Sequence, residues 1–153
     1  MNQQIVSVWK SLYEFNVRYI TIGGFAVNIY GYNRNTGDID IYIEDTKVNR
    51  INLRNAFKAI GLRDFEAIET MQFISGWSDF TLSYGLRLDI MTSVKGLEDV
   101  PFESLLNSAT IVVIEKVPVY FIDYDNLIIA KKATNRLKDQ LDIEELNKLN
   151  NED

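Results

Sequence analysis

The chain of 153 residues contains no cysteine and no histidine. The absence of cysteine excludes disulfide bonds and thiolate metal sites, and it fits a reducing compartment. The absence of histidine excludes imidazole zinc sites, Ser-His-Asp hydrolysis and histidine general bases. Catalysis by this chain would therefore use carboxylates, lysines, tyrosines or a hard metal ion.

The sequence also lacks a long apolar run and a leader peptide. No stretch approaches the roughly 18 residues that a membrane-spanning helix needs, and Met1 is not followed by a basic and then an apolar segment. We therefore expect a cytoplasmic protein with no membrane partner. Linkers rich in proline, glycine or serine are absent too, and the length predicts a single domain over residues 1–153.

Positive charge is in short supply. Lysine and arginine number 16 against 22 aspartates and glutamates, which gives a formal net charge of −6. The surface as a whole is therefore not that of a nucleic-acid-binding protein. A local basic patch is still compatible with this balance, and the lysines and arginine near the end of the chain are the candidate.

Apolar periodicity predicts helices before, between and after strands, which is typical of an α+β fold with a mixed, twisted sheet and helices packed on it. We expect a core of about residues 17–122 and closing helices over about residues 123–151. One hairpin should turn at Tyr84 and Gly85, and residues 110–122 should form two strands kinked at Pro118. The expected helices are 3–17, 25–31, 48–61, 101–109, 123–134 and 138–150, and the expected strands are 17–24, 38–44, 71–75, 79–85, 86–94 and 110–122.

Two aspartates alternate with isoleucines in the stretch "DIDIYIE" that starts at Asp38. Residues i and i+2 of a strand point to the same face, about 7 Å apart, so Asp38 and Asp40 should present both carboxylates on one side. Magnesium prefers hard oxygen ligands and usually binds through one or two carboxylates together with substrate phosphates. The pair is therefore a candidate magnesium platform. The competing interpretation is a turn cap at Asp38 and an ion pair at Asp40.

A third aspartate, Asp89, lies in the apolar stretch "LRLDIMTSV". A charge inside such a run is costly unless it is paired or coordinated. If the two acidic strands are neighbours, Asp89 completes a cluster that can hold metal ions beside a phosphoryl displacement. The alternative is an ordinary charge on an edge strand.

Gly23 and Gly24 follow an apolar strand and precede a short helix, 14 residues before Asp38 at the nearer glycine. Glycine allows positive φ and close approach of the backbone to a ligand, and a helix N-terminus favours phosphate. The two glycines are a candidate phosphate-binding turn, although a purely structural turn has the same sequence.

These motifs together resemble the nucleotidyltransferase superfamily with the polymerase-β-type catalytic core. More narrowly, the chain resembles small bacterial nucleotidyltransferases related to the toxin of AbiE abortive-infection systems. The closing segment of those families is similar to "DNLIIAKKATNRLKDQLDIEEL", and the similarity spans residues 19–146. The matching positions of the closing segment are Leu127, Ile128, Lys131, Arg136, Lys138, Asp139 and Asp142.

The resemblance implies transfer of a nucleoside monophosphate from an NTP, ATP among them, to an acceptor hydroxyl, with Mg²⁺ or Mn²⁺ as cofactor. It makes Asp38 and Asp40 the metal-binding pair, and Asp89 a third acid that assists deprotonation of the acceptor. Four groups of residues would then surround the nucleotide: Gly23 and Gly24 along the triphosphate, Arg34 and Thr36 in the loop before the acids, Lys131 on a phosphate, and Arg136 or Lys138 as its companion.

The resemblance further implies RNA or tRNA as acceptor and a cognate antitoxin protein as partner, while protein hydroxyls and small molecules stay open as acceptors. One alternative function is a catalytically inactive nucleotide-binding or antitoxin-like partner protein. Another is an antibiotic nucleotidyltransferase. The basic residues of the closing segment could equally form a solvated helix face. Tyr30 and Tyr32 could stack on a base or serve in packing.

Overall fold

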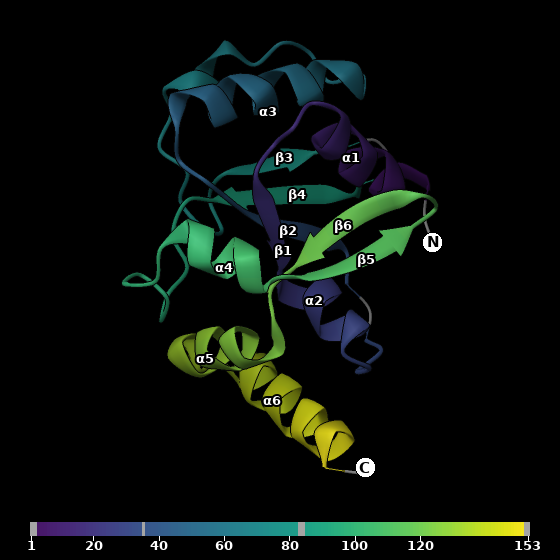
Figure 1. Cartoon of the computed structure of the whole chain (residues 1–153), viewed down its shortest axis with the longest axis vertical. Helices are drawn as coiled ribbons and strands as arrows, with labels where there is room; N and C mark the ends of the chain where they lie inside the picture. Colours follow the sequence, from purple (N-terminus) through teal and green to yellow (C-terminus); the bar gives the residue numbers. More distant parts are fainter. Residues whose placement is uncertain (1–2, 35, 83–84, 152–153) are drawn as a thin grey trace.

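The computed structural model describes residues 3–34, 36–82 and 85–151. Within these residues a six-stranded sheet has the order β3-β4-β2-β1-β6-β5 (Figure 1). β2 runs antiparallel to β1 and parallel to β4, so the expected mixed α+β architecture is confirmed. The strands are β1 (Tyr19–Ile22), β2 (Asp38–Ile43), β3 (Asp79–Thr81), β4 (Arg87–Met91), β5 (Thr110–Ile114) and β6 (Val117–Phe121).

Helices cover the sheet and extend beyond it. Trp9 of α1 packs edge-on against Phe25 and Phe121, with ring centroids 5.6 and 5.8 Å away, and so joins α1 to α2 and β6. Figure 1 shows α5 and α6 as a pair below the sheet. The helices are α1 (Gln3–Glu14), α2 (Gly23–Ile29), α3 (Lys47–Ala59), α4 (Phe102–Ser108), α5 (Tyr124–Thr134) and α6 (Leu137–Asn150), with a 3-10 turn at Glu66–Glu69.

β2 has one core face and one open face. Ile39, Ile41 and Ile43 are fully buried, whereas Asp38 is exposed and Asp40 is partly buried. This alternation follows from the period of two in a strand, and it places both aspartates on the face that carries the polar side chains. The segregation of acids from isoleucines is what positions the site described below.

The segment 71–75, which we expected to be a strand, is irregular. Side chains satisfy its backbone instead of a neighbouring strand: the Arg50 guanidinium donates to the carbonyl of Met71 at 2.7 Å. At the other end of the segment, the Ile74 N–H donates to the Ser78 hydroxyl at 2.7 Å. Because these local bonds compete with a β ladder, the strand prediction was wrong here.

The kink expected at Pro118 was also wrong. Pro118 lies within β6, directly opposite Val113 of β5. The chain reverses at Glu115 and Lys116, whose φ angles of 48° and 71° are those of a two-residue hairpin turn. The other expected hairpin is present, because β3 and β4 pair antiparallel. Of its expected turn residues, Tyr84 lies outside the described residues.

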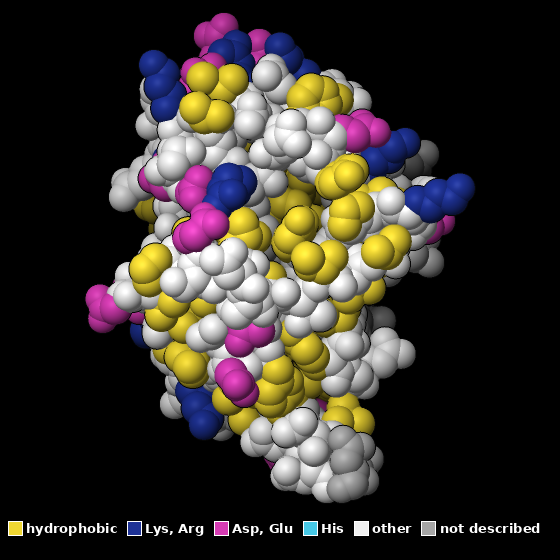
Figure 2. All heavy atoms as spheres, in the orientation of Figure 1, with side chains coloured by type: hydrophobic (Ala, Val, Ile, Leu, Met, Phe, Trp, Pro, Cys, Tyr) yellow, Lys and Arg dark blue, Asp and Glu magenta, His cyan; other side chains and the backbone are white. Residues whose placement is uncertain are grey.

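No helix in the described ranges combines the length and the apolar character that a membrane crossing requires. Exposed apolar side chains do occur, among them Ile111 and Val113 of the edge strand β5. Figure 2, which has the orientation of Figure 1, shows hydrophobic side chains gathered near the middle of the visible face, in the region of β5 and β6.

Candidate active site

A cavity of about 560 Å³ lies between the amino end of β2 and the α5–α6 pair. The segments that line it are far apart in the sequence, from residue 22 to residue 139. Ten of the residues that the sequence nominated for the site line the cavity: Gly23, Gly24, Arg34, Thr36, Asp38, Asp40, Asp89, Lys131, Arg136 and Lys138. Tyr30 and Tyr32, the candidates for base stacking, are not among its lining residues.

The sheet register sets the positions of the three acids. Asp40 of β2 lies directly opposite Asp89 of the parallel strand β4, and Asp38 lies opposite Arg87. Since neighbours in register point to the same face, the carboxylates share the open face of the sheet. The Gly76 N–H donates to Asp89 Oδ2 at 3.0 Å. Asp89 Oδ1 is a buried oxygen that has no hydrogen-bond partner among the described residues.

Burial and the repulsion of neighbouring carboxylates make Asp40 and Asp89 reluctant to ionise. Burial first, and then the negative charges of Asp89 and Asp38, raise the pKa of Asp40 from 3.8 to about 6. Burial likewise raises the pKa of Asp89, Asp79 and Asp38 add to the effect, and the Gly76 N–H opposes it. A cation placed among the carboxylates would relieve this repulsion.

The donor set fits a hard divalent cation that arrives with its substrate. In the part of the chain that the structure describes, no three acidic side chains stand close enough together to form a ready-made metal site. Magnesium, however, commonly takes only one or two protein carboxylates and completes its shell with phosphate and water oxygens. The paired acids on β2 and the unpartnered oxygen of Asp89 therefore suit Mg²⁺ or Mn²⁺ bound with a phosphate.

The two glycines allow close packing at the edge of the cavity. Gly23 has a φ of +68°, and a Cβ atom on it would lie 2.2 Å from Asp40 Oδ2. A Cβ atom on Gly24 would lie 2.6 Å from the hydroxyl oxygen of Thr36. Because the two glycines lack a Cβ atom, Asp40 and the loop before β2 can pack directly against the turn. Both glycines also line the cavity.

Gly23→Ala is expected to reduce both stability and nucleotide binding. Positive φ disfavours alanine by about 1 kcal/mol, and the new methyl group would push Asp40 from its place. Gly37→Ala is the matched control, because a Cβ atom there meets nothing within 4 Å. Urea denaturation of both variants measures the effect, and equal midpoints for the two would contradict it.

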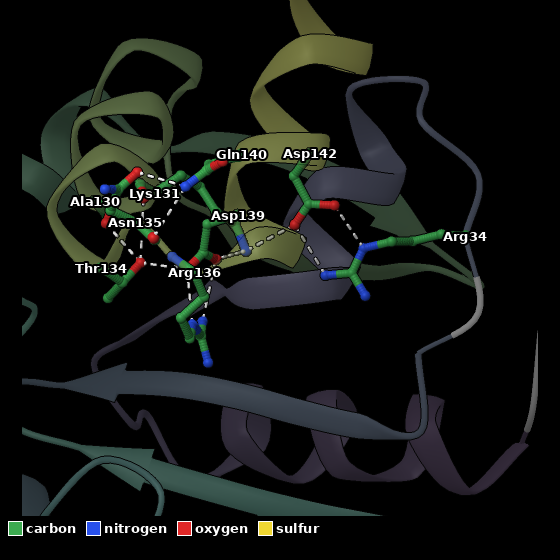
Figure 3. Close-up of polar contacts among 9 residues, drawn as sticks. All are labelled: Arg34, Ala130, Lys131, Thr134, Asn135, Arg136, Asp139, Gln140 and Asp142. Carbon is green, nitrogen blue, oxygen red and sulfur yellow. Dashed lines mark hydrogen bonds and ion pairs between the residues drawn. The ribbon is translucent and has the colours of Figure 1, made fainter.

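The opposite side of the cavity is a buried ionic cluster (Figure 3). Lys131 Nζ lies 3.0 Å from Asp142 and 3.3 Å from Asp139. Arg34 reaches the same Asp142 with two nitrogens, at 2.9 and 3.1 Å. The Arg136 guanidinium donates to Asp139 at 2.7 Å. Lys131, Arg34 and Arg136 are therefore already oriented by carboxylates on α6, and Asp142 ties the loop before β2 to α6.

Asp139 is the centre of this cluster and is fully buried. Burial alone would raise its pKa, but hydrogen bonds from Arg136 and Thr134, together with the charge of Lys131, hold the pKa well below its usual range. The Arg136 backbone N–H also donates to Asp139, 3.0 Å away, and so caps the start of α6. Asp139 and Asp142 stood out in the sequence only as motif positions, and no pattern indicated that they hold the cations.

Several residues at the cavity were missed from the sequence. Lys95 lines the cavity because the next residue, Gly96, packs closely against α5. Gly96 has a φ of +92°, and a Cβ atom on it would lie 2.7 Å from the Cβ atom of Ala133. Gly76 was missed because its contact with Asp89 depends on an irregular loop. In the sequence, Lys95 is a lysine in a loop and Gly76 is a turn glycine. Such residues occur in many loops and do not by themselves indicate a site.

Comparisons with known proteins bear on the family and the fold of the chain. The family model described as "Nucleotidyl transferase of unknown function (DUF2204)" matches residues 1–153. A crystal structure from Thermotoga maritima, of a protein provisionally assigned as a nucleotidyltransferase, matches with a TM-score of 0.59 and 16% sequence identity. That match covers 99% of this chain and 92% of the other, and at this identity it shows a shared fold. No curated protein matches the chain.

Proposed function

Because the chain belongs to the DUF2204 family of nucleotidyl transferases, we propose that it transfers a nucleoside monophosphate from an NTP to an acceptor hydroxyl with the help of a divalent metal. The observation that carries this proposal is the convergence of Asp38, Asp40 and Asp89 on one cavity, opposite a cluster of cations. The carboxylates can bind a metal ion and accept a proton from the acceptor, and the cations can stabilise the negative charge of the phosphates.

In the proposed reaction, Asp89 accepts the proton of the acceptor hydroxyl, and the hydroxyl oxygen forms a bond to the α-phosphorus. The bond from that phosphorus to the oxygen that bridges to the β-phosphate breaks, and pyrophosphate leaves with the electron pair. Burial, the first cause of the raised pKa of Asp89 in the metal-free chain, favours uptake of a proton by this carboxylate. The Gly76 N–H keeps this carboxylate oriented.

A bound Mg²⁺ or Mn²⁺ would be held by Asp38 and Asp40 together with phosphate oxygens, and would supply charge neutralisation to the phosphates. The other residues position the nucleotide. Gly23 and Gly24 leave room for the triphosphate beside the acids, and Arg34 and Thr36 border it from the loop. The cations Lys131 and Arg136, fixed by Asp139, face the triphosphate from the helices.

The proposal includes RNA, tRNA among them, as acceptor, ATP as a donor, and a cognate antitoxin as protein partner. Its support is the likeness of residues 19–146 to nucleotidyltransferases of abortive-infection systems. Lys95 and Lys138 add support, because they line the cavity and have no ion pair among the described residues. The intact acids argue against an inactive partner protein.

Thermal unfolding with each NTP, with and without Mg²⁺ or Mn²⁺, tests the nucleotide site. At a ligand concentration of 100 times Kd, the stabilisation is about 2.7 kcal/mol, which corresponds to a rise in Tm of roughly 5–10 °C for a chain of this size. The rise should require the metal and should vanish in the double variant Asp38→Ala, Asp40→Ala. A shift of equal size in that double variant would overturn the assignment of these acids.

A further inference from the structure

The sheet has one protected edge and one open edge. At the protected edge, β3 is three residues long and its Asp79 forms an ion pair with Arg87 of β4. At the other edge, β5 runs over five residues from Thr110 to Ile114 without a charge, a proline or a glycine. Short length, charges and proline are the usual means by which proteins stop an edge strand from adding another strand. Among the described residues, none pairs with the outer side of β5.

The free backbone groups of β5 belong to Ile111 and Val113. Ile114 pairs with Val117 across a two-residue turn, which makes these two a hydrogen-bonded pair. Hydrogen-bonded and non-hydrogen-bonded pairs alternate along an antiparallel ladder, so the N–H and C=O groups of Ile111 and Val113 point away from β6. The backbone groups of Val112, between them, point toward β6. β5 therefore offers a donor and an acceptor from each of two residues to a strand beside it.

The same two residues carry exposed apolar side chains. Ile111 is 55% exposed and Val113 is 67% exposed. Their partners in register on β6, Tyr120 and Pro118, are partly buried and continue this apolar face. Figure 2 shows hydrophobic side chains gathered in the region of these two strands. Contiguous apolar surface of this kind marks an interaction site more often than scattered apolar residues do.

We propose that β5 pairs antiparallel with β5 of a second copy of this chain, about a two-fold axis at Val112. In this register Ile111 of each copy lies opposite Val113 of the other, and the two residues of each pair exchange both of their N–H···O=C bonds. Every residue from Thr110 to Ile114 is β-branched, so each cross-strand pair is one that stabilises a sheet. The strand is thus its own complement in hydrogen bonding and in side-chain type.

The charges at the two ends of β5 also favour a second copy. Beyond the strand, the pairing sets the turn of one copy beside Ser108 of the other, and the Ser108 hydroxyl donates to Asp123 at 3.1 Å. The turn carries the exposed Lys116, whereas the Glu115 carboxylate accepts a hydrogen bond from Gln3 of α1. The cation of each copy therefore approaches an acid of the other. This complementarity opposes the repulsion between two chains that each have a net charge of −6.

The mass of the chain in solution tests the pairing. Light scattering after gel filtration, at concentrations up to about 100 μM, should give twice the 17.7 kDa of a single chain. Val113→Lys should give the mass of a single chain, because a lysine on an edge strand opposes pairing. The dimer contains the change twice, and a loss of about tenfold for each occurrence weakens association by about 100-fold. Val48→Lys is the matched control, because Val48 is 68% exposed on α3, and this variant should stay dimeric.

Val112→Cys tests the register directly, because the chain has no cysteine of its own. At the two-fold axis the two copies of residue 112 form a non-hydrogen-bonded pair with α-carbons about 4.5 Å apart, a separation that a disulfide can bridge. Mild oxidation should therefore convert this variant to a covalent dimer on a non-reducing gel. Val48→Cys should form far less covalent dimer under the same conditions.

Three results would each overturn the proposal. The first is a single-chain mass for the wild type at the highest concentration, which would leave the edge of β5 to a strand of another protein. The second is a dimer that Val113→Lys does not dissociate, because the interface would then lie elsewhere. The third is equal cross-linking of Val112→Cys and Val48→Cys. Association is measured without nucleotide, and β1 and β6 separate β5 from the acidic strand β2, so these results are independent of the proposed function.

Discussion

Replacing Asp40 by asparagine is expected to abolish nucleotidyl transfer and to make the metal-free protein more stable. Activity should fall by at least about 100-fold, the usual loss when one group that stabilises developing charge is removed. Stability should rise, because burial and the negative charges of Asp89 and Asp38 make the ionised form of Asp40 unfavourable in the folded chain. A pKa of about 6 instead of 3.8 corresponds to up to about 3 kcal/mol at neutral pH.

The sign of the pH dependence follows from the raised pKa. Between about pH 4 and pH 6 the folded chain binds more protons at Asp40 than the unfolded chain does, so this residue lowers stability as the pH rises through that window. The asparagine variant should lack this decline.

Urea denaturation in EDTA at pH 4.5 and pH 7.5, together with a transfer assay, checks both halves of the Asp40→Asn prediction. Asp99→Asn, an exposed acid outside the cavity, is the control for loss of one charge. A variant that is less stable than the wild type at pH 7.5 would contradict the repulsion at Asp40. A variant that retains a tenth of the activity would contradict its catalytic role.

Asp139→Ala is expected to cause the largest loss of stability, about 3–5 kcal/mol, which is typical when one partner of a buried ion pair is removed. The change leaves Lys131 beside a single carboxylate, and it removes the acceptor of Arg136 and Thr134 together with the cap of α6. Denaturant unfolding measures the loss. Hydrogen exchange should show it first in α5 and α6, which Asp139 joins.

Glu144→Ala is the matched control on the same helix, because the Glu144 side chain is exposed and, within the described part of the chain, its one ion pair is with Lys148 at the surface. Its effect should stay within about 1 kcal/mol. Because the pKa of Asp139 is depressed, its contribution is present at neutral pH and is lost as the pH falls below about 4. An Asp139→Ala variant as stable as Glu144→Ala would show that the cluster does not hold the helices together.

The sequence predicted best where local chemistry and local geometry agree. The alternation of Asp38 and Asp40 with isoleucines follows from the period of the strand, and the structure has a core face and an open face as expected. Asp89 could be nominated because a charge in an apolar strand is costly unless it is paired or coordinated. In the structure, the strand register places Asp89 opposite Asp40. The roles of these acids are still predictions.

The errors arose where side-chain contacts or unusual backbone angles decide the local structure. Residues 71–75 have strand-forming side chains, but Arg50 and Ser78 satisfy their backbone from elsewhere in the chain. The turn at Glu115 and Lys116 uses positive φ in two residues other than glycine, so it carries no turn signature. The phosphate role of Lys131 stays a prediction, and the two carboxylates that hold this lysine in the structure could not be foreseen from the sequence.

The division of the cavity between an acidic sheet and a basic helical pair also orders events during synthesis. A ribosome makes β2 and β4 before it makes α5 and α6. A nascent chain therefore exposes its aspartates to dissolved cations well before Lys131 and Arg136 have emerged beside them. Translation thus completes the acidic wall of the cavity before its basic wall exists.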